Sequence, residues 1–318
     1  MVQIEDNRVT EELYDIIILG GGVAGLSAAM TAGRLGLRVL VLEKAVFGGS
    51  VAVLETVTEY PGVAKVGGWE LTQTMVRQAE DAGCVLIDSI DAVDLMELEG
   101  GTFRIKSSEA YEFWGRSVII TTGGQPKPLG LENEELFAQR GIHTCAQCAG
   151  PRYKGKEVVI AGNGSWAVEA ALHLLSMECR VSFITGDAKM AGNVFLIDKL
   201  MCHEGFQFMA GWHIEKLYGT EYLEEIDLVN LKSGKMKRKK VAAVFIYRSI
   251  VPNINIVPAR QNAKGFPLLN EDRMTSLPGV FAAGRVADHK LPVQVIVGDG
   301  SRAALSAAAW LQADTRKT

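Results

Sequence analysis

Two cysteines separated by two residues are the feature of this sequence with the clearest chemistry. The segment Cys145-Ala146-Gln147-Cys148 has the spacing of a dithiol that can close a small disulfide. In such a pair one thiolate attacks a partner disulfide and the other resolves the mixed disulfide. Half of a zinc site is the alternative, but zinc needs two further ligands, and the nearby candidate is His143. The spacing therefore favours redox exchange, and we expect no metal.

The other cysteines and the composition narrow the class of protein. Cys84, Cys179 and Cys202 lack a paired spacing, so we expect ordinary buried thiols rather than a disulfide scaffold. A net charge of −4 gives the chain no bias toward nucleic acid. The first residues are acidic and lack the apolar core of a secretory signal, and no apolar run has the length of a bilayer span. We therefore expect a cytoplasmic protein without nucleic-acid or membrane partners.

A glycine-rich segment stands near the start of the chain. Gly20–Gly25 (GGGVAG) fits the pattern G-x-G-x-x-G. It follows the apolar run Tyr14–Leu19, an expected buried strand, and opens an expected helix over Ala24–Leu35. The next expected strand, Arg38–Leu42, is followed directly by Glu43. Strand, loop, helix and acid in this register are typical of a dinucleotide-binding site.

Each residue of this first glycine loop has a physical role. Gly20 permits the tight turn, Gly22 lets the backbone approach a pyrophosphate, and Gly25 lets the helix pack closely on the strand. The phosphates then lie at the helix N-terminus, and Glu43 accepts hydrogen bonds from ribose hydroxyls. A glycine-rich turn without a ligand is the alternative, but the matching strand, helix and acid argue against it.

The same unit occurs a second time. A strand at Glu157–Ala161 is followed by Gly162–Ala167 (GNGSWA), a helix to about Met177 and a strand at Arg180–Ile184. Strands that alternate with helices imply parallel sheets with helices on their faces. The chain is therefore predicted to be α/β, with two Rossmann-like three-layer domains.

The chain is expected to leave the first domain and to return to it. Segments rich in Gly and Pro at Thr122–Gly130 and Ser249–Pro258 are typical of domain crossings. A buried strand at Val280–Ala283 and an Ala-rich amphipathic helix at Gly300–Leu311 then belong to the returned part.

Four blocks in this order resemble the low-molecular-weight thioredoxin reductases over about residues 14–311. They are GGGVAGLSAA with Glu43, Gly48-Gly49 and TEYPG; IITTGGQPKPLGL; GIHTCAQCAGPRYKGKEVVIAGNGSWAVEAALHLL; and LPGVFAAGRVADH with VGDGSRAALSAAAWL. The resemblance implies a FAD-binding domain split into residues 1–124 and 252–318, with a central redox-disulfide and nucleotide-binding-like domain inserted at 125–251.

The resemblance also implies roles for single residues. Cys148 matches the cysteine nearer the flavin, and Cys145 matches the one that attacks thioredoxin. The family is typically homodimeric, with a thioredoxin-like protein as acceptor. The expected FAD-binding residues come from both parts of the split domain: Gly20, Gly22, Val23, Ala24, Gly25, Glu43, Lys44, Gly49, Ser50, Thr122, Gly123, Gly284 and Arg285.

The electron donor is where this chain departs from the family. Members that use NADPH carry an arginine cluster after the second strand of the central domain, and those guanidinium groups pair with the 2′-phosphate. Residues 185–191 contain no arginine, and Asp187 repels a phosphate. We therefore expect a donor other than NADPH. NADH fits poorly because Thr185, not an acid, ends the second strand.

An acidic ferredoxin is a possible donor, since a basic face would attract it. Lys235–Lys240 (KMKRKK) is such a cluster, expected on a hairpin between strands at Leu228–Leu231 and Val241–Tyr247. A solvated charged turn is the alternative interpretation.

The second glycine loop leaves two readings open. Gly162, Gly164, Ser165, Trp166 and Ala167 form a possible second nucleotide site, for NADH or for the adenylate of a second flavin. The Trp166 indole is bulky enough to crowd a dinucleotide or to stack on another ring, and a packing residue is an equally favoured alternative. A two-flavin disulfide flavoprotein is therefore one alternative to a thioredoxin reductase.

Two further departures concern the chemistry. The family's acid after the second cysteine is Ala149 here, so the proton donor is unassigned, with His143 and His289 as candidates by residue type. The family's acid after the last FAD-contacting glycine is Arg285, which can pair with pyrophosphate. Both changes make a redox sensor with little thioredoxin reductase activity the other alternative.

Overall fold

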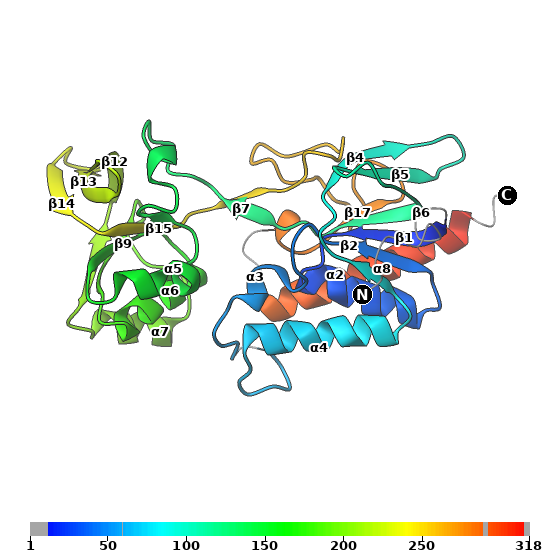
Figure 1. The fold of residues 1–318 in the computed structure, drawn as a ribbon, viewed down its shortest axis with the longest axis horizontal. Coiled ribbons are helices and arrows are strands. Elements are labelled where there is room, and N and C mark those ends of the chain that lie inside the picture. Colours follow the sequence, from blue (N-terminus) through cyan, green and yellow to red (C-terminus); the bar gives the residue numbers. More distant parts are fainter. Residues whose placement is uncertain (1–11, 59, 289–291, 315–318) are drawn as a thin grey trace. The chain divides into compact units, whose positions relative to one another are not determined.

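The computed structural model describes residues 12–58, 60–288 and 292–314 (Figure 1). The chain divides into two compact units, one formed by Met1–Gln125 with Val251–Thr318 and the other by Pro126–Ile250. The sequence predicts these crossings at 124/125 and 251/252. At the crossings, strands β7 (Gly124–Pro126) and β16 (Ile250–Pro252) pair as a two-stranded sheet.

A seven-stranded sheet forms the first unit, in the order β3-β2-β1-β6-β5-β4 with β17 also paired to β6. β1, β2, β3, β6 and β17 run parallel, whereas β4, β5 and β6 form an antiparallel meander. The strands are β1 (Leu13–Leu19), β2 (Val39–Leu42), β3 (Val85–Ile87), β4 (Ala92–Glu97), β5 (Phe103–Ser107), β6 (Glu112–Ile120) and β17 (Val280–Ala282). The parallel strands read as apolar runs because both faces of the sheet are covered.

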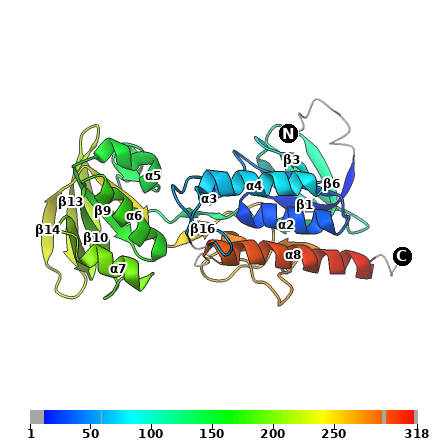
Figure 2. The same ribbon diagram turned by 90° about the horizontal axis from the view of Figure 1, so that it is seen from below.

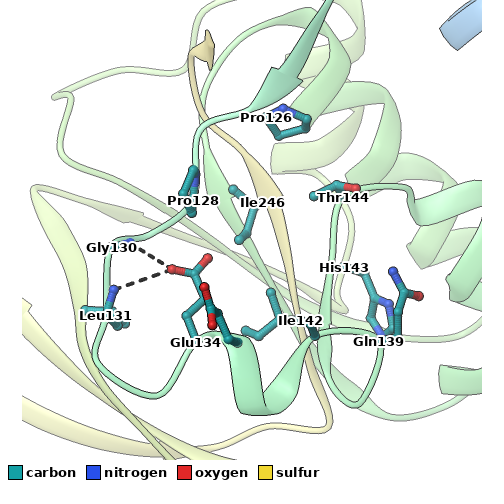
Figure 3. Close-up of a pocket in the computed structure, with 12 residues that line it drawn as sticks. Pro126, Pro128, Gly130, Leu131, Glu134, Gln139, Ile142, His143, Thr144 and Ile246 are labelled. Carbon is teal, nitrogen blue, oxygen red and sulfur yellow. Dashed lines mark hydrogen bonds between the residues drawn. The ribbon is translucent and has the colours of Figure 1, made fainter. Parts of the chain in front are cut away.

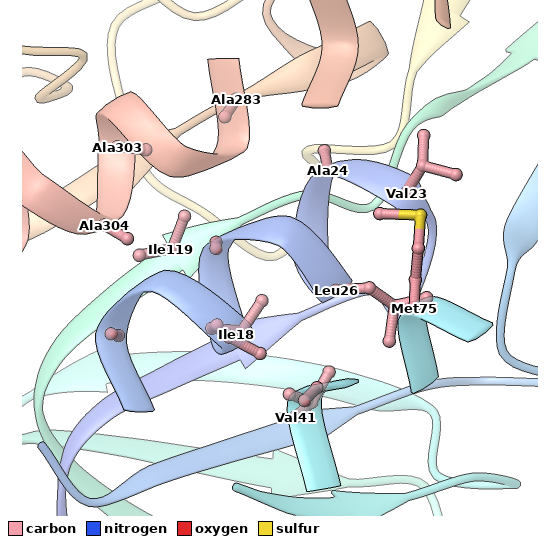
Figure 4. Packing of buried hydrophobic residues seen from close by; sticks show 14 of the residues in the cluster. Ile18, Val23, Ala24, Leu26, Val41, Met75, Ile119, Ala283, Ala303 and Ala304 are labelled. Carbon is pink, nitrogen blue, oxygen red and sulfur yellow. The ribbon is translucent and has the colours of Figure 1, made fainter. Parts of the chain in front are cut away.

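Helices cover one face of this sheet. They are α2 (Val23–Arg34), the short α3 (Gly49–Ala52), α4 (Gly68–Asp81) and α8 (Val293–Asp314), and α2, α4 and α8 lie side by side (Figure 2). Their apolar side chains join those of the sheet in one buried cluster, which includes Ile18, Leu26, Met75 and Ile119 (Figure 4). On the opposite face, Phe103, Phe113 and other apolar side chains form a second buried cluster. The unit thus has the three layers that the sequence predicts.

Helix α8 begins earlier than the sequence predicts, at Val293 rather than near Gly300. The β-branched run that opens it has low helix propensity, so the pattern alone gave no signal. Val293 and Ile296 are buried in the same core cluster as α2, and this packing overrides the local preference.

The central unit has a five-stranded sheet in the order β11-β10-β9-β15-β8, with all pairs parallel. Its strands are β8 (Ile142–His143), β9 (Glu157–Gly162), β10 (Arg180–Thr185), β11 (Phe206–Ala210) and β15 (Ala243–Tyr247). The helices are α5 (Ala146–Ala149), α6 (Ser165–Ser176) and α7 (Val194–Met201). Helix α6 packs on one face of the sheet, and a three-stranded antiparallel sheet packs on the other. The predicted α/β class with parallel Rossmann-like sheets is confirmed.

The basic segment Lys235–Lys240 is mostly a strand and not the turn of the predicted hairpin. The antiparallel sheet contains β12 (Trp212–Gly219), β13 (Leu223–Asn230) and β14 (Met236–Lys240), so the basic residues themselves form an edge strand paired with β13. The segment expected to return from the hairpin is β15, which belongs to the parallel sheet. β14 carries no apolar alternation, and this is why the pattern failed to reveal it.

Within the described ranges, every helix is too short or too polar to cross a bilayer.

Helices α2 and α8 cross very closely. A Cβ added at Gly300 would lie 2.1 Å from the carbonyl oxygen of Ala24, closer than real atoms approach. Gly298, two residues earlier in the same helix, has nothing within 4 Å of such a Cβ. The crossing therefore requires a glycine at position 300 and not at position 298.

Gly300→Ala should lower the free energy of unfolding by about 1–3 kcal/mol, because the helices must separate to admit the methyl group. Gly298→Ala should raise it by about 0.5–1 kcal/mol, because alanine has the higher helix propensity. Urea unfolding of the two variants and the wild type measures both effects. Equal stability of the two alanine variants would refute the close crossing.

Candidate active site

Cys145 and Cys148 form a disulfide, with their Cα atoms 5.4 Å apart. Cys145 stands immediately before helix α5, and its Sγ accepts a hydrogen bond from the backbone N–H of Cys148 at 3.1 Å. Within the central unit, Cys148 is exposed and Cys145 is partly buried. A hydrogen bond to sulfur favours the thiolate, so after reduction this contact stabilises the charge on Cys145.

A tyrosine hydroxyl lies beside the segment between the two cysteines. The backbone N–H of Ala146 donates to the Oη of Tyr247 at 3.0 Å, from the end of strand β15. Burial raises the pKa of Tyr247 to about 12. The hydroxyl therefore keeps its proton at neutral pH and is available as a hydrogen-bond donor next to the pair.

His143, a candidate proton donor, is buried in strand β8 and only 2% exposed. Its Nε2 lies 2.7 Å from the hydroxyl of Tyr153. Burial lowers the pKa of His143 to about 4, so the ring is neutral at physiological pH and cannot act as a charged acid there. His289, the other candidate, lies outside the described residues, and Ala149 is buried.

His143 is also among the residues that line a pocket of about 360 Å³ within the central unit (Figure 3). Its Nδ1 has no hydrogen-bond partner in the part of the chain that the structure describes. Ile142, Thr144 and Ile246 line the same pocket. The Glu134 carboxylate, also at the wall, accepts hydrogen bonds from the backbone N–H groups of Leu129 and Gly130.

The other three cysteines differ in exposure. Cys84 and Cys179 are buried and donate to backbone carbonyls, and burial raises the pKa of both thiols, that of Cys84 to about 11. Cys202 is exposed, so the expectation that it is buried was wrong. It follows the last residue of α7, where the helix meets solvent. Over the described ranges, no group of three His, Cys, Asp or Glu side chains is arranged to hold a metal ion.

The first glycine loop has the geometry of a dinucleotide site. Gly20 has φ +105°, and a Cβ there would lie 2.6 Å from the Thr121 carbonyl oxygen. The Glu43 carboxylate accepts from the backbone N–H groups of Gly21 at 2.6 Å and Ala45 at 2.9 Å. These two bonds fix the carboxylate at the end of β2, with further lone pairs for ribose hydroxyls.

The amino end of helix α2 is open to an anion. Gly22 is its N-cap and makes no side-chain capping bond, so the first-turn N–H groups, beginning at Val23 and Ala24, are not used by a side chain there. Gly22 forms an isolated β-bridge with Gly48, and a Cβ on Gly49 would lie 3.1 Å from the Gly22 Cα. The two glycine segments therefore form one surface of bare backbone.

The returned part of the chain adds a cation to this surface. Arg285 donates from Nη1 to Ser50 Oγ at 3.4 Å, and burial lowers the pKa of its guanidinium. Gly284, with φ +77°, leaves only 2.8 Å between an added Cβ and the Cβ of Ala24. A cation that is partly withdrawn from water next to an open helix end suits a pyrophosphate. The residues present therefore fit a dinucleotide.

Asp299 fixes the turn at Gly284 and was not among the residues predicted from the sequence. It is 5% exposed, accepts from the Gly284 N–H at 2.7 Å and forms an ion pair with Arg273. An aspartate inside the apolar start of helix α8 was the signal that could have revealed it, since a buried carboxylate requires partners.

Thr122, Gly123 and Lys44 are the remaining residues that the sequence predicts to bind FAD. Thr122 and Gly123 follow β6. The Asn253 side-chain amide donates to the Thr122 carbonyl oxygen at 3.0 Å, and the Asn253 backbone N–H donates to that of Gly123 at 3.0 Å. The Lys44 side chain is exposed and pairs with Asp91 at 2.7 Å.

The second glycine loop joins β9 to α6. Gly162 has φ +148°, and a Cβ there would lie 1.9 Å from the Tyr247 carbonyl oxygen. Ser165 and Trp166 open helix α6, and Ala167 is buried beneath them. In the first unit, the N–H of Gly48, after β2, donates to the Gly21 carbonyl oxygen. In the same way, the loop that follows strand β10 contacts this second glycine loop directly, through Asn163.

His143 makes folding depend on pH. Its folded pKa of about 4 lies below the ordinary value of 6.5, so the unfolded state binds more protons between these values. This group's contribution is complete above about pH 6.5 and falls as pH drops toward about 4, by up to about 1.4 kcal/mol per pH unit. His143→Gln, which does not titrate, should lose that dependence when urea unfolding is followed over this pH range. Parallel curves for the two proteins would contradict a buried neutral imidazole.

Comparisons with known proteins agree with this geometry. The family model for pyridine nucleotide-disulphide oxidoreductases matches residues 14–313. Thioredoxin reductase from Bacillus subtilis (strain 168) is 30% identical over 305 residues, which cover 93% of this chain and 94% of that protein. Thioredoxin reductase from Treponema pallidum (strain Nichols) is 30% identical over 301 residues, covering 94% and 97%.

Solved structures agree as well. Lactococcus lactis thioredoxin reductase in its FR conformation superposes with a TM-score of 0.88 at 27% identity, covering 94% of this chain and 99% of that one. T. acidophilum thioredoxin reductase gives a TM-score of 0.86 at 28% identity, covering 93% and 98%. Since the likeness extends over nearly the whole length of each chain, this protein belongs to the low-molecular-weight thioredoxin reductases of the pyridine nucleotide-disulphide oxidoreductase family and is a thioredoxin-reductase-like flavin disulfide oxidoreductase with FAD as its cofactor.

Proposed function

We propose that the chain transfers electrons from FAD to the Cys145–Cys148 disulfide and on to thioredoxin or a similar small protein, and that its donor is not NADPH. The observation that carries the proposal is the closed disulfide between Cys145 and Cys148, in a chain of this family. Relatives named thioredoxin reductases support the acceptor. By the same likeness, we propose a cytoplasmic homodimer.

The first glycine loop and its neighbours would hold the cofactor. Glu43 would accept from the ribose, the open end of α2 and Arg285 would face the pyrophosphate, and Gly49 and Ser50 would line the approach. When bound, FAD supplies a carrier that takes two electrons from a donor and gives them to a disulfide.

The two cysteines divide the exchange between them. Two electrons and two protons convert their disulfide into two thiols. The Cys145 thiolate then attacks one sulfur of the acceptor disulfide, and the other acceptor sulfur leaves as a thiolate. Cys148 next attacks Cys145 in the mixed disulfide, the Cys145–Cys148 bond re-forms, and the acceptor departs as a dithiol. The N–H of Cys148, which lies 3.1 Å from Cys145 Sγ, stabilises the attacking thiolate.

A small acidic protein such as a ferredoxin is the donor that we favour. Residues 185–191, which follow strand β10, contain no arginine, and Asp187 lies where a 2′-phosphate would be repelled. Lys235, just before β14, and Lys237 and Lys240 on that strand are exposed cations. Arg238 is held by Asp227, and Lys239 by Glu157, so the docking face has fewer cations than the sequence alone suggests.

A redox-sensing flavoprotein is the second candidate. Ala149 is buried where relatives carry an acid, and the buried His143 is neutral. Slow proton transfer at the pair would leave a protein that records the redox state without rapid turnover.

The test is turnover of thioredoxin disulfide by the FAD-loaded protein under anaerobic conditions. Wild type supplied with reduced ferredoxin should reduce thioredoxin, and Cys148→Ser should lose at least about a hundredfold in rate because no thiolate resolves the mixed disulfide. Cys202→Ser is the matched control, since that thiol is also exposed but lies outside the pair, and it should retain the wild-type rate.

Three results would contradict parts of the proposal. Wild-type rates in Cys148→Ser would rule out electron flow through the pair. Bleaching of the flavin by NADPH as fast as by ferredoxin would rule out the proposed donor. Slow turnover with every donor would favour the redox sensor.

A further inference from the structure

The second glycine loop is closed by the chain itself. We propose that residues 186–193, here called the capping loop, occupy its phosphate end and that Asn163 holds them there, so that the central unit takes neither a pyridine dinucleotide nor the adenylate of a second flavin. This inference deepens the proposed function, because it supplies a structural reason for a donor other than NADPH.

The end of helix α6 is where a pyrophosphate would bind. In a Rossmann unit the phosphates accept hydrogen bonds from N–H groups at the start of the helix after the glycine loop. Helix α6 starts at Ser165, and its N-cap Gly164 makes no side-chain capping bond. By this criterion alone, the second loop is as open to an anion as the first.

The capping loop lies across this end of the helix. A Cβ built on Gly192 would be 3.2 Å from the Cα of Ser165 and 3.3 Å from its backbone nitrogen. A phosphate oxygen must approach such a nitrogen to about 2.7–2.9 Å. Gly192, which has no Cβ, therefore lets the capping loop lie against the first residue of α6, beside the place where a phosphate would bind.

Asn163, the second residue of the loop motif, ties the capping loop down with its whole side-chain amide. Its Nδ2 donates to Asp187 Oδ2 at 2.7 Å and to the Lys189 carbonyl oxygen at 3.1 Å. Its Oδ1 accepts from the N–H groups of Ala191 at 2.8 Å and of Gly164 at 2.9 Å. Three of these four bonds reach the capping loop, and the fourth fixes the amide to the glycine loop itself.

Both ends of the capping loop are anchored as well. Asp187, near its start, exchanges hydrogen bonds with Thr185 at the end of β10, through its carboxylate and its backbone N–H. Asn193, at its end, caps helix α7 by accepting from the N–H of Phe195 at 3.0 Å. The loop is therefore held at its start, its middle and its end.

This arrangement also sets the charge of the site. The Asp187 carboxylate is held by Asn163 and Thr185 just beyond β10, where the adenosine ribose of a dinucleotide would lie. Two separate effects thus exclude a dinucleotide: the backbone of the capping loop blocks it, and the Asp187 carboxylate repels its phosphates. Single substitutions can distinguish them.

The test is binding of ADP, which carries the adenosine and pyrophosphate of the excluded ligands, to FAD-loaded protein by titration calorimetry. Wild type should show no binding at millimolar ADP. Asn163→Gly removes all four amide bonds and should bind ADP at least about tenfold more tightly than wild type. Hydrogen exchange gives an independent readout: the Ala191 amide should be protected in wild type and should exchange at least about tenfold faster in Asn163→Gly.

Asp187→Asn is the matched control, because it removes the charge while keeping an oxygen acceptor for Asn163. It should remain closed to ADP. Binding of ADP by Asp187→Asn as tight as by Asn163→Gly would overturn the proposal in favour of charge repulsion alone. Micromolar ADP binding by wild type would overturn it too. So would unchanged ADP binding by Asn163→Gly with normal FAD content, whether or not Ala191 exchange changes.

The test of the electron donor and the test of ADP binding have independent outcomes. If Asn163→Gly gains no affinity and NADPH still does not bleach wild type, the capping loop is not the cause and the proposed donor stands. If NADPH bleaches wild type, the proposed donor fails whatever ADP does.

Discussion

The first unit depends on how closely helix α2 approaches the carboxyl ends of strands β1 and β6. A Cβ at Gly25 would lie 1.9 Å from the Gly20 carbonyl oxygen, and one at Gly20 would lie 2.6 Å from that of Thr121. On the other side of the helix, Gly300 brings α8 equally close to Ala24. Because no side chain intervenes at these points, the helix N-terminus lies close to the ends of these strands. Glu43 accepts there from the Gly21 N–H, and Arg285 bonds to Ser50.

The same strand–loop–helix unit serves opposite purposes in the two halves of the molecule. In the first, Gly22 leaves the end of α2 without a side-chain cap. In the second, Asn163 and the capping loop cover the end of α6, so the Rossmann architecture is kept as a scaffold. That scaffold holds Cys145 and Cys148 at the start of α5 and places Tyr247 beside them. The central unit therefore holds the disulfide on a Rossmann-like scaffold.

Sequence patterns predicted the parts of this fold that local chemistry decides. The runs at Tyr14–Leu19 and Glu157–Ala161 are continuous and apolar because both faces of a parallel sheet are buried, and both form strands. The glycine loops were recognisable because backbone geometry restricts the residue type. Strand β14 and the first turns of α8 were missed, since a charged edge strand lacks alternation and a β-branched run disguises a helix.

Contacts between residues distant in the sequence could not be predicted in the same way. Asp299 supports Gly284 only once α8 packs on α2, and Asn163 reaches Ala191 only once the loop after β10 folds back. Likewise the neutral state of His143 follows from burial in the sheet. In each case the residue type permits several roles, and the tertiary structure selects one.

Electron exchange between FAD and the Cys145–Cys148 pair is tested most directly by anaerobic titration with dithionite, followed through the flavin absorbance. Wild type should take up about four electrons per chain before the flavin is fully bleached, two for FAD and two for the disulfide, and Cys148→Ser should take up about two. Complete bleaching of wild type by about two electrons, with the disulfide still closed, would contradict that exchange.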